Sequence, residues 1–329
     1  MMAWPVSDHF DGERFFNPTW PQSNAPTLRS LFKMLREPRS RWPRPFENKG
    51  TPRLHETLAI GDIAITFVNH ATFLIQTGGT TILTDPIWSE RASPFTWMGP
   101  RRARRPGVEF DRLPNIDVVL LSHNHYDHLD IATLRRLRQT FSPLLLVAAG
   151  DARVVGPLGF PEVRELDWWD DLPVSRALKI TFVPAQHFSA RGLFDRDRSL
   201  WGGYMIESHG RFVYFGGDSG YSTHFSDIKS RFGPPDVAML PIGAYEPRWF
   251  MQPIHMNPAE AVRAHRDLGA KQSIGMHFGT FHLTPEAIDR PQAELKAALD
   301  ASGTPDREFV TLDEGETRIY RASNALLRP

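Results

Sequence analysis

The ten residues from 121 to 130, LSHNHYDHLD, constrain this chain more than any other segment. They place three histidines and one aspartate within six positions, at His123, His125, Asp127 and His128. Side chains so close in sequence cannot all project from one face of a helix or strand, so the segment is predicted to be a loop. Imidazole and carboxylate groups that converge from a loop are typical ligands of divalent cations. The spacing therefore predicts a site for two metal ions.

The residues on either side place this loop in the fold. Residues 116–121 (IDVVLL) form a short apolar run typical of a buried central strand, and residues 130–139 (DIATLRRLRQ) place apolar side chains on one helical face. The loop is thus predicted to join the carboxyl end of a strand to a helix. We interpret Asp130 as the N-cap of that helix and not as a further ligand.

The amino-acid composition limits the classes of function that the chain can have. Hydrophobic residues make up 41% of 329 positions, enough for a full core, and the formal net charge is +0, so no nucleic-acid partner is expected. The absence of cysteine leaves metal binding to histidine and carboxylate and fits a reducing compartment. With no signal peptide and no run of about 18 apolar residues, we expect a cytoplasmic protein, either soluble or peripheral at the inner membrane face.

The chain is predicted to have two parts. Residues 1–55, rich in proline and tryptophan, are expected to form an arm packed on a domain that spans residues 56–329. Within the arm, residues 27–37 (TLRSLFKMLRE) predict an amphipathic helix with its apolar positions at Leu28, Leu31, Phe32 and Leu35. Packing of this helix on the core is the favoured interpretation, and contact with an anionic membrane surface is the alternative.

The domain is predicted to be an α/β sandwich. Its first residues alternate in the manner of hairpins around the Gly78-Gly79 turn, and strands then alternate with helices. Helices are predicted to begin after Asn257 and after Thr284, since N-P-A-E and T-P-E are typical start signals. Mixed sheets covered by helices on their outer faces follow from this order.

Three further metal-competent side chains end predicted strands. His187 follows ITFVPAQ, Asp218 follows RFVYFGG and His277 follows SIGM. A single histidine in such a position is usually an ordinary hydrogen-bonded residue, but three strand ends of this kind beside H-x-H-x-D-H favour a shared metal site. Asp85, after the strand TTILT, is expected to accept a hydrogen bond from a ligand imidazole, and His70 is expected to support the ligands without binding metal.

The order of H-x-H-x-D-H, then His, Asp and His, resembles the metallo-β-lactamase superfamily, whose αββα sandwich holds two metal ions between its sheets. The resemblance implies two Zn²⁺ ions and seven ligands. It assigns His123, His125 and His187 to the first ion, Asp127, His128 and His277 to the second, and Asp218 to both.

A closer resemblance covers nearly the whole chain. The segments NHATFLI, LTDPIWSERASPFTWMGPRRARRP, PAQHFS, FGGDSGY, PIGAYEPRWFM and MHFGTF are similar to the family of N-acyl-phosphatidylethanolamine-hydrolysing phospholipases D. This implies a phosphodiesterase that yields N-acylethanolamine and phosphatidic acid. Asp127 and Asp218 are then expected to be catalytic, and His255 is expected either to protonate the leaving oxygen or to be structural. A lactonase or esterase of the same superfamily is the alternative, and a di-iron oxidoreductase is disfavoured.

The expected partners follow from these readings. They are a phospholipid or small-molecule substrate, a membrane in peripheral contact, and a second copy of the chain in a homodimer. The arginine run from Arg101 to Arg105 is interpreted as a solvated charge run, with contact to anionic headgroups as the alternative. Residues 245–250 (YEPRWF) could line an apolar pocket mouth or belong to the core.

Overall fold

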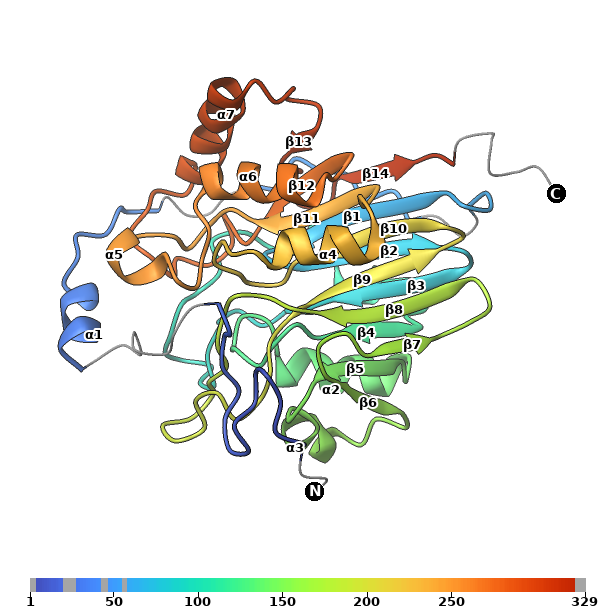
Figure 1. Ribbon diagram of the computed structural model, residues 1–329, viewed down its shortest axis with the longest axis horizontal. Helices are drawn as coiled ribbons and strands as arrows, with labels where there is room; N and C mark the ends of the chain where they lie inside the picture. Colours follow the sequence, from blue (N-terminus) through green and yellow to red (C-terminus); the bar gives the residue numbers. More distant parts are fainter. Residues whose placement is uncertain (1–3, 20–27, 43–46, 55–57, 323–329) are drawn as a thin grey trace.

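Two mixed sheets packed face to face form the centre of the molecule (Figure 1). The computed structural model describes residues 4–19, 28–42, 47–54 and 58–322. One seven-stranded sheet has the order β14-β1-β2-β3-β4-β5-β6, and the other has the order β13-β12-β11-β10-β9-β8-β7. Helices α2 and α3 cover the outer side of the first sheet, and α4 and α6 cover the second (Figure 1). The predicted αββα sandwich is confirmed.

The described elements have the following bounds. The strands are β1 (Ile63–Asn69), β2 (Thr72–Thr77), β3 (Thr80–Thr84), β4 (Val118–Leu120), β5 (Leu144–Ala148), β6 (Val163–Leu166), β7 (Asp171–Pro173), β8 (Leu178–Val183), β9 (Gly203–Ser208), β10 (Arg211–Phe215), β11 (Val237–Pro241), β12 (Gln272–Met276), β13 (Phe309–Val310) and β14 (Thr317–Tyr320). The α-helices are α1 (Leu28–Leu35), α2 (Ile131–Thr140), α3 (Ala152–Val155), α4 (His224–Phe232), α5 (Arg248–Met251), α6 (Pro258–Leu268) and α7 (Arg290–Ser302). Two 3₁₀ turns are η2 (Phe110–Arg112) and η3 (Gly156–Leu158).

The core lies in two layers. Large aromatic side chains, among them Phe67, Phe182 and Phe215, fill the space between the sheets, while leucines of α2 pack against the outer face of the first sheet. Strands buried on both faces read as the near-continuous apolar runs seen in the sequence. Tyr204 ties the layers together, because its hydroxyl donates to the carbonyl oxygens of Leu121 (2.8 Å) and Leu146 (3.2 Å) on the opposite sheet.

One of the two predicted helix starts is correct. Asn257 caps α6 in a full capping box with Glu260. The helix predicted after Thr284 is wrong, since α7 begins only at Arg290. The Pro285 and Glu286 carbonyls, which a helix would need for its first turns, accept instead from the Ser40 amide (3.0 Å) and the Trp42 indole (2.9 Å).

The amino-terminal residues that the structure describes lie against the domain. Phe10 and Phe15 are buried in the main core, and Phe15 donates its amide to the Asp197 carbonyl (2.8 Å). Helix α1 forms where it was predicted, but the side chains of its apolar positions, at Leu28, Leu31, Phe32 and Leu35, lie outside the described residues. The boundary drawn at residue 55 also falls outside them, so the division into arm and domain stays a prediction.

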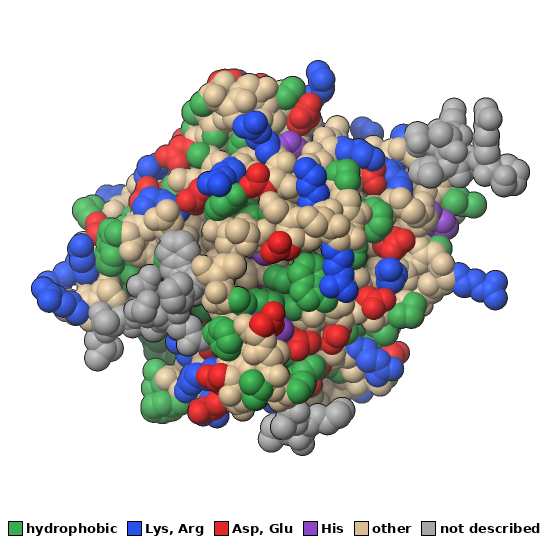
Figure 2. All heavy atoms as spheres, in the orientation of Figure 1, with side chains coloured by type: hydrophobic (Ala, Val, Ile, Leu, Met, Phe, Trp, Pro, Cys, Tyr) green, Lys and Arg blue, Asp and Glu red, His purple; other side chains and the backbone are tan. Residues whose placement is uncertain are grey.

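The described surface carries mixed charge. Figure 2 shows Lys and Arg side chains interspersed with Asp and Glu side chains on the face in view. No described helix has the length and apolar character needed to cross a membrane.

Candidate metal centre

The predicted ligands gather at one end of the sandwich because the strands that carry them end there. The loop 121–130 follows β4 of the first sheet, whereas His187, Asp218 and His277 follow β8, β10 and β12 of the second. Parallel neighbours such as β10, β11 and β12 bring their carboxyl ends to one edge. Side chains from both sheets therefore meet between them.

The first set consists of His123, His125, His187 and Asp218, whose ligand atoms all lie within 4.8 Å of one another. The His125 Nδ1 atom lies 2.9 Å from His123 Nε2 and 3.2 Å from His187 Nε2. Three ring nitrogens directed at one point can bind one cation together. Hydrogen bonds among neutral imidazoles would leave some of these nitrogens without a partner. This set can hold one metal ion.

The second set consists of His70, Asp127, His128 and His277 within the same 4.8 Å limit. The Asp127 Oδ2 atom lies 2.9 Å from His70 Nε2, 3.3 Å from His277 Nε2 and 3.5 Å from His128 Nε2. The structure therefore brings His70 to the same distances as the predicted ligands, although the sequence suggested a supporting role. This set can hold a second ion.

Asp218 lies between the two sets. Its Oδ2 atom is 3.1 Å from the Nε2 atoms of both His128 and His277, and 3.8 Å and 3.9 Å from those of His187 and His123. Its other oxygen, Oδ1, is buried without a hydrogen bond to any described residue, and so is His128 Nε2. Buried polar atoms left without partners are costly, and cations would satisfy them. The donor set thus fits two metal ions.

The protonation states of the histidines suit metal binding in the first set. Burial lowers the pKa of His125 to about 3 and that of His187 to about 4, so both imidazoles are neutral near pH 7. Burial acts to raise the pKa of Asp218, but His128 and His277 hold it well below its usual range. Burial likewise acts to lower the pKa of His277, but Asp218 and Asp127 raise it to about 9. A metal at His277 has to displace that proton.

Supporting residues orient the ligands. Asp85 Oδ2 accepts from His128 Nδ1 (2.7 Å) and from the Ser122 hydroxyl (2.6 Å), which confirms the contact expected for Asp85. Asp130 accepts from the Ala132 amide and so caps α2 as predicted. Arg191 braces the loop from the other side by donating to the carbonyl oxygens of Asn124 and Leu129.

A cavity of about 770 Å³ opens above both sets. His125, Asp127, Asp218, His255 and His277 lie at its floor. Its walls are mainly apolar side chains from α1, α5 and the neighbouring loops, with Met34, Phe188, Trp249, Phe250, Met251, Pro253, Ile254 and Leu283 among them. Such a cavity can receive a long apolar group beside the metal-competent floor.

Some residues of the segment 245–250 line the cavity and others belong to the core. Trp249 and Phe250 line the cavity, whereas Tyr245 is buried. Arg248 has a structural role, since it pairs with Glu260 (2.7 Å) and donates to the His255 carbonyl (2.9 Å).

The arginine run is not a solvated patch throughout. Arg102 is buried and donates to the carbonyl oxygens of Ile87 and Ser89, and Arg104 pairs with the buried Glu314 at 2.8 Å. These contacts fix the loop beside the cavity. The sequence could not show this, since the carbonyl partners leave no pattern in it.

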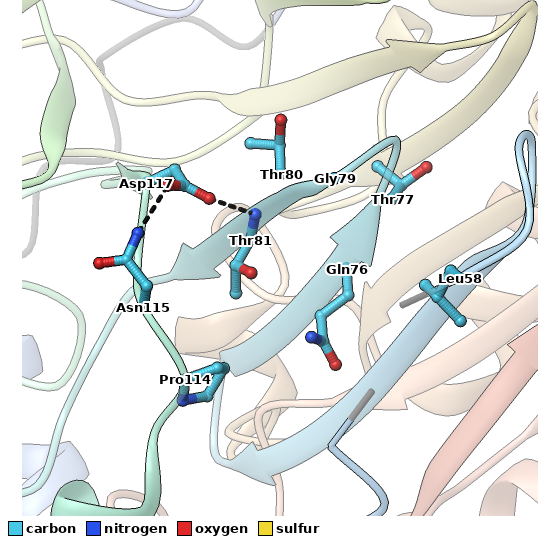
Figure 3. A pocket seen from close by; sticks show the side chains of 9 residues that line it. All are labelled: Leu58, Gln76, Thr77, Gly79, Thr80, Thr81, Pro114, Asn115 and Asp117. Carbon is cyan, nitrogen blue, oxygen red and sulfur yellow. Dashed lines mark hydrogen bonds between the residues drawn. The ribbon is translucent and has the colours of Figure 1, made fainter. Parts of the chain in front are cut away.

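A second hollow lies at the far end of the first sheet, beside the Gly78-Gly79 turn (Figure 3). Figure 3 shows Asp117 directed at Asn115 and at the Thr81 amide, to which it bonds at 2.7 Å and 2.8 Å. Both carboxylate oxygens are thus engaged, and no histidine lines the hollow. The chemistry therefore belongs to the first cavity.

Comparisons with known proteins agree with this geometry. The profile of the beta-lactamase superfamily domain matches residues 80–278. N-acyl-phosphatidylethanolamine-hydrolyzing phospholipase D 1 of Caenorhabditis elegans is 36% identical over 95% of this chain and 94% of its own length. The mitochondrial enzyme of that name from Saccharomyces cerevisiae is 36% identical over 74% of this chain and 53% of its own.

A solved structure shows the same fold. Igni18, a metallo hydrolase from the archaeon Ignicoccus hospitalis, superposes with a TM-score of 0.61 at 20% identity, covering 80% of this chain and 100% of that one. Fold, sequence and site together assign the chain: it belongs to the metallo-β-lactamase superfamily of hydrolases and, within it, to the family of N-acyl-phosphatidylethanolamine-hydrolysing phospholipases D.

Proposed function

We propose that the chain is a binuclear zinc phosphodiesterase that hydrolyses N-acyl-phosphatidylethanolamine-like lipids to N-acylethanolamine and phosphatidic acid. The observation that carries the proposal is Asp218, placed between two ligand sets at the floor of a mainly apolar cavity. When water hydrolyses a phosphodiester, the attacking oxygen and the leaving oxygen lie on opposite sides of phosphorus. Two adjacent ions would be suited to stabilise these two oxygens. The apolar walls suit an acyl chain.

The ligand roles in this proposal follow the two sets. His123, His125 and His187 would hold one ion, Asp127, His128 and His277 would hold the other, and Asp218 would contribute to both. His70, which also lies in the second set, would support Asp127 through its contact at 2.9 Å. Zinc accepts the nitrogen and oxygen donors that this cysteine-free chain offers. When bound, such a pair of ions lowers the pKa of water toward neutrality and stabilises negative charge on the phosphoryl oxygens.

His255 is the proposed proton donor to the leaving oxygen. Its Nε2 atom lies 4.0 Å from Asp218 Oδ2, and its Nδ1 atom makes no hydrogen bond with a described residue. Its backbone is fixed at both ends, since its amide donates to the Met251 carbonyl and its carbonyl accepts from Arg248. The ring can therefore face the cavity from a rigid position. Because burial holds the pKa of His255 well below its usual range, the neutral ring would first take up the proton that the attacking water releases and then give it to the departing N-acylethanolamine.

We also propose that the enzyme meets its substrate at a membrane surface. Large exposed apolar side chains lie on the loops and helix beside the cavity, including Trp97 (72% exposed), Leu193 (92%) and Phe194 (85%). The loop 91–101 contributes Ala92 to the cavity, and the loop 190–198 contributes Arg196. Apolar tips around an apolar cavity can enter a lipid interface while the headgroup reaches the floor.

An isotope experiment tests the reaction. Zinc-loaded protein acts on N-acyl-phosphatidylethanolamine in anionic vesicles in ¹⁸O-water, and mass spectrometry locates the label. Attack on phosphorus puts one ¹⁸O into the phosphate of phosphatidic acid and none into the N-acylethanolamine. Label in a fatty-acid carboxylate, or turnover of lactones alone, contradicts the proposal and favours the esterase or lactonase alternative.

A further inference from the structure

One arginine side chain faces the cavity. Among the described residues that line it, Arg196 alone carries a guanidinium or ammonium group. Its Cζ atom lies 4.1 Å from the centroid of the Phe188 ring, and that ring contacts His125 at 4.5 Å and His187 at 5.0 Å between centroids. A single aromatic ring therefore separates the guanidinium from the first ligand set.

The backbone that carries Arg196 is held in place. The Arg196 carbonyl accepts a hydrogen bond from Arg14, and the next carbonyl, of Asp197, accepts from the Phe15 amide (2.8 Å). The Asp197 amide in turn donates to the Ser189 carbonyl (2.8 Å). With the stacking on Phe188, these contacts reduce the entropy that the side chain loses when it binds a ligand.

The guanidinium still has donors to offer. Its Nε is buried and forms an ion pair with Asp197 Oδ2 at 3.4 Å that lacks hydrogen-bond geometry, so Asp197 partly offsets the charge of the group. No described residue accepts a hydrogen bond from its two terminal nitrogens, and these remain available to a ligand. The nearby Asp195 does not compete, because its Oδ1 accepts from the Arg191 and Gly192 amides. A planar guanidinium with free donors matches the oxygens of a phosphate group.

We propose that Arg196 forms an anion subsite at the cavity mouth that binds a phosphate oxygen of the lipid and so selects anionic diesters over neutral esters. The inference rests on the proposed function, since it names the charge that the same cavity recognises. The phosphate could belong to the reacting lipid or to a neighbouring headgroup, and the two sources share this chemistry.

Direct binding tests the subsite. Zinc-loaded wild type and the variants Arg196→Gln, Arg196→Lys and Arg198→Gln are titrated calorimetrically with monomeric dihexanoyl phosphatidic acid. Because hydrogen bonds to charged groups contribute about 1.5–3 kcal/mol, Arg196→Gln should weaken binding by about 10-fold or more, and Arg196→Lys by less. Arg198, two residues on, pairs with Glu13 at 3.1 Å, so its variant should bind like wild type. Equal affinity of wild type and Arg196→Gln at equal zinc content overturns the inference.

Kinetics then identify the source of the phosphate. If the reacting lipid supplies it, Arg196→Gln lowers kcat/KM on a water-soluble phosphodiester by the factor seen in binding, while turnover of a neutral ester stays unchanged. If a neighbouring headgroup supplies it, the loss appears only on vesicles that contain anionic lipid. In a third outcome, the wild type binds phosphatidate through Arg196 and yet cleaves no diester. That result would support the anion subsite and contradict the proposed phosphodiesterase activity. Should Arg196→Gln fold poorly, as judged by circular dichroism, Arg196→Lys and Arg196→Met carry the same comparison.

Discussion

The floor of the cavity and its rim are built in opposite ways. At the floor the ligands are buried except for the partly exposed His125 and Asp127, and neighbouring residues fix them, as Asp85 fixes His128. At the rim, on the loop that contributes Arg196 to the cavity, Leu193 and Phe194 are 92% and 85% exposed. Rigid strand ends thus position the groups that react, whereas loops present the surface that meets the substrate. Changes at the floor should affect every substrate, and changes at the rim should distinguish between substrates.

The largest effect is expected at Asp218. Because its carboxylate lies between both ligand sets, Asp218→Asn should lower turnover of every substrate by at least about 1,000-fold and reduce the bound metal. Asp85→Asn is the matched control, since Asp85 only orients His128, and it should cost about 10- to 100-fold. Rates at saturating zinc and elemental analysis measure both. Equal losses of turnover in the two variants would mean that Asp218 and Asp85 do not differ in role as proposed.

A smaller and selective effect is expected at the rim. Replacing Leu193 and Phe194 together by serine should lower turnover on vesicles by about 10-fold, since less apolar area enters the interface, and leave a water-soluble diester unaffected. The control replaces Val6 and Ile60, which are 73% and 66% exposed and do not line the cavity. An equal loss of turnover on vesicles and on the water-soluble diester would show that the loop supports the ligands at the floor and does not bind the membrane surface.

The smallest effect is expected from His9, where the amino-terminal residues meet the domain. Burial acts to lower the pKa of His9, but hydrogen bonds to Asp167 (2.7 Å) and Asp8 (2.6 Å) raise it above 6.5. Protonated His9 therefore adds stability that is fully present below pH 6.5 and is lost as pH rises through the higher folded pKa. Because Asp8 is exposed, the gain should be only about 1 kcal/mol.

Denaturant unfolding of wild type and His9→Gln between pH 5.5 and about 9 measures this contribution. The difference in unfolding free energy between the two should shrink as pH rises. Zinc content should stay constant in both if the floor is independent of this contact. A difference that grows with pH would contradict the assigned direction of the pKa shift.

The side chains that meet at the floor could be found in the sequence because strand ends are local features, whereas their roles as ligands stay a prediction. His187, Asp218 and His277 each follow an apolar run, so their convergence with the loop 121–130 could be inferred without any distance. The capping box at Asn257 follows from an equally local signal, whereas the strand order within each sheet was not predicted.

The rim was harder to predict because it depends on tertiary contacts. Phe188 and Arg196 gave no periodic signal, and their importance comes from stacking on each other beside His125. Arg102 looked like a surface charge, but it is buried against carbonyl oxygens. The helix expected after Thr284 fails for a similar reason, since its carbonyls bond to a segment more than two hundred residues earlier.

The division of the ligands between the sheets has a consequence for biogenesis. Neither sheet alone carries a complete set, because the loop after β4 supplies His123 and His125 while the second sheet supplies His187 and Asp218. Full-affinity binding of the proposed ions would therefore require that the two sheets have docked, and a chain still emerging from the ribosome without β10 would not hold an ion in the first set. Metal binding would then indicate that folding is complete, because the second set lacks His277 until the last ligand-bearing strand, β12, has been incorporated.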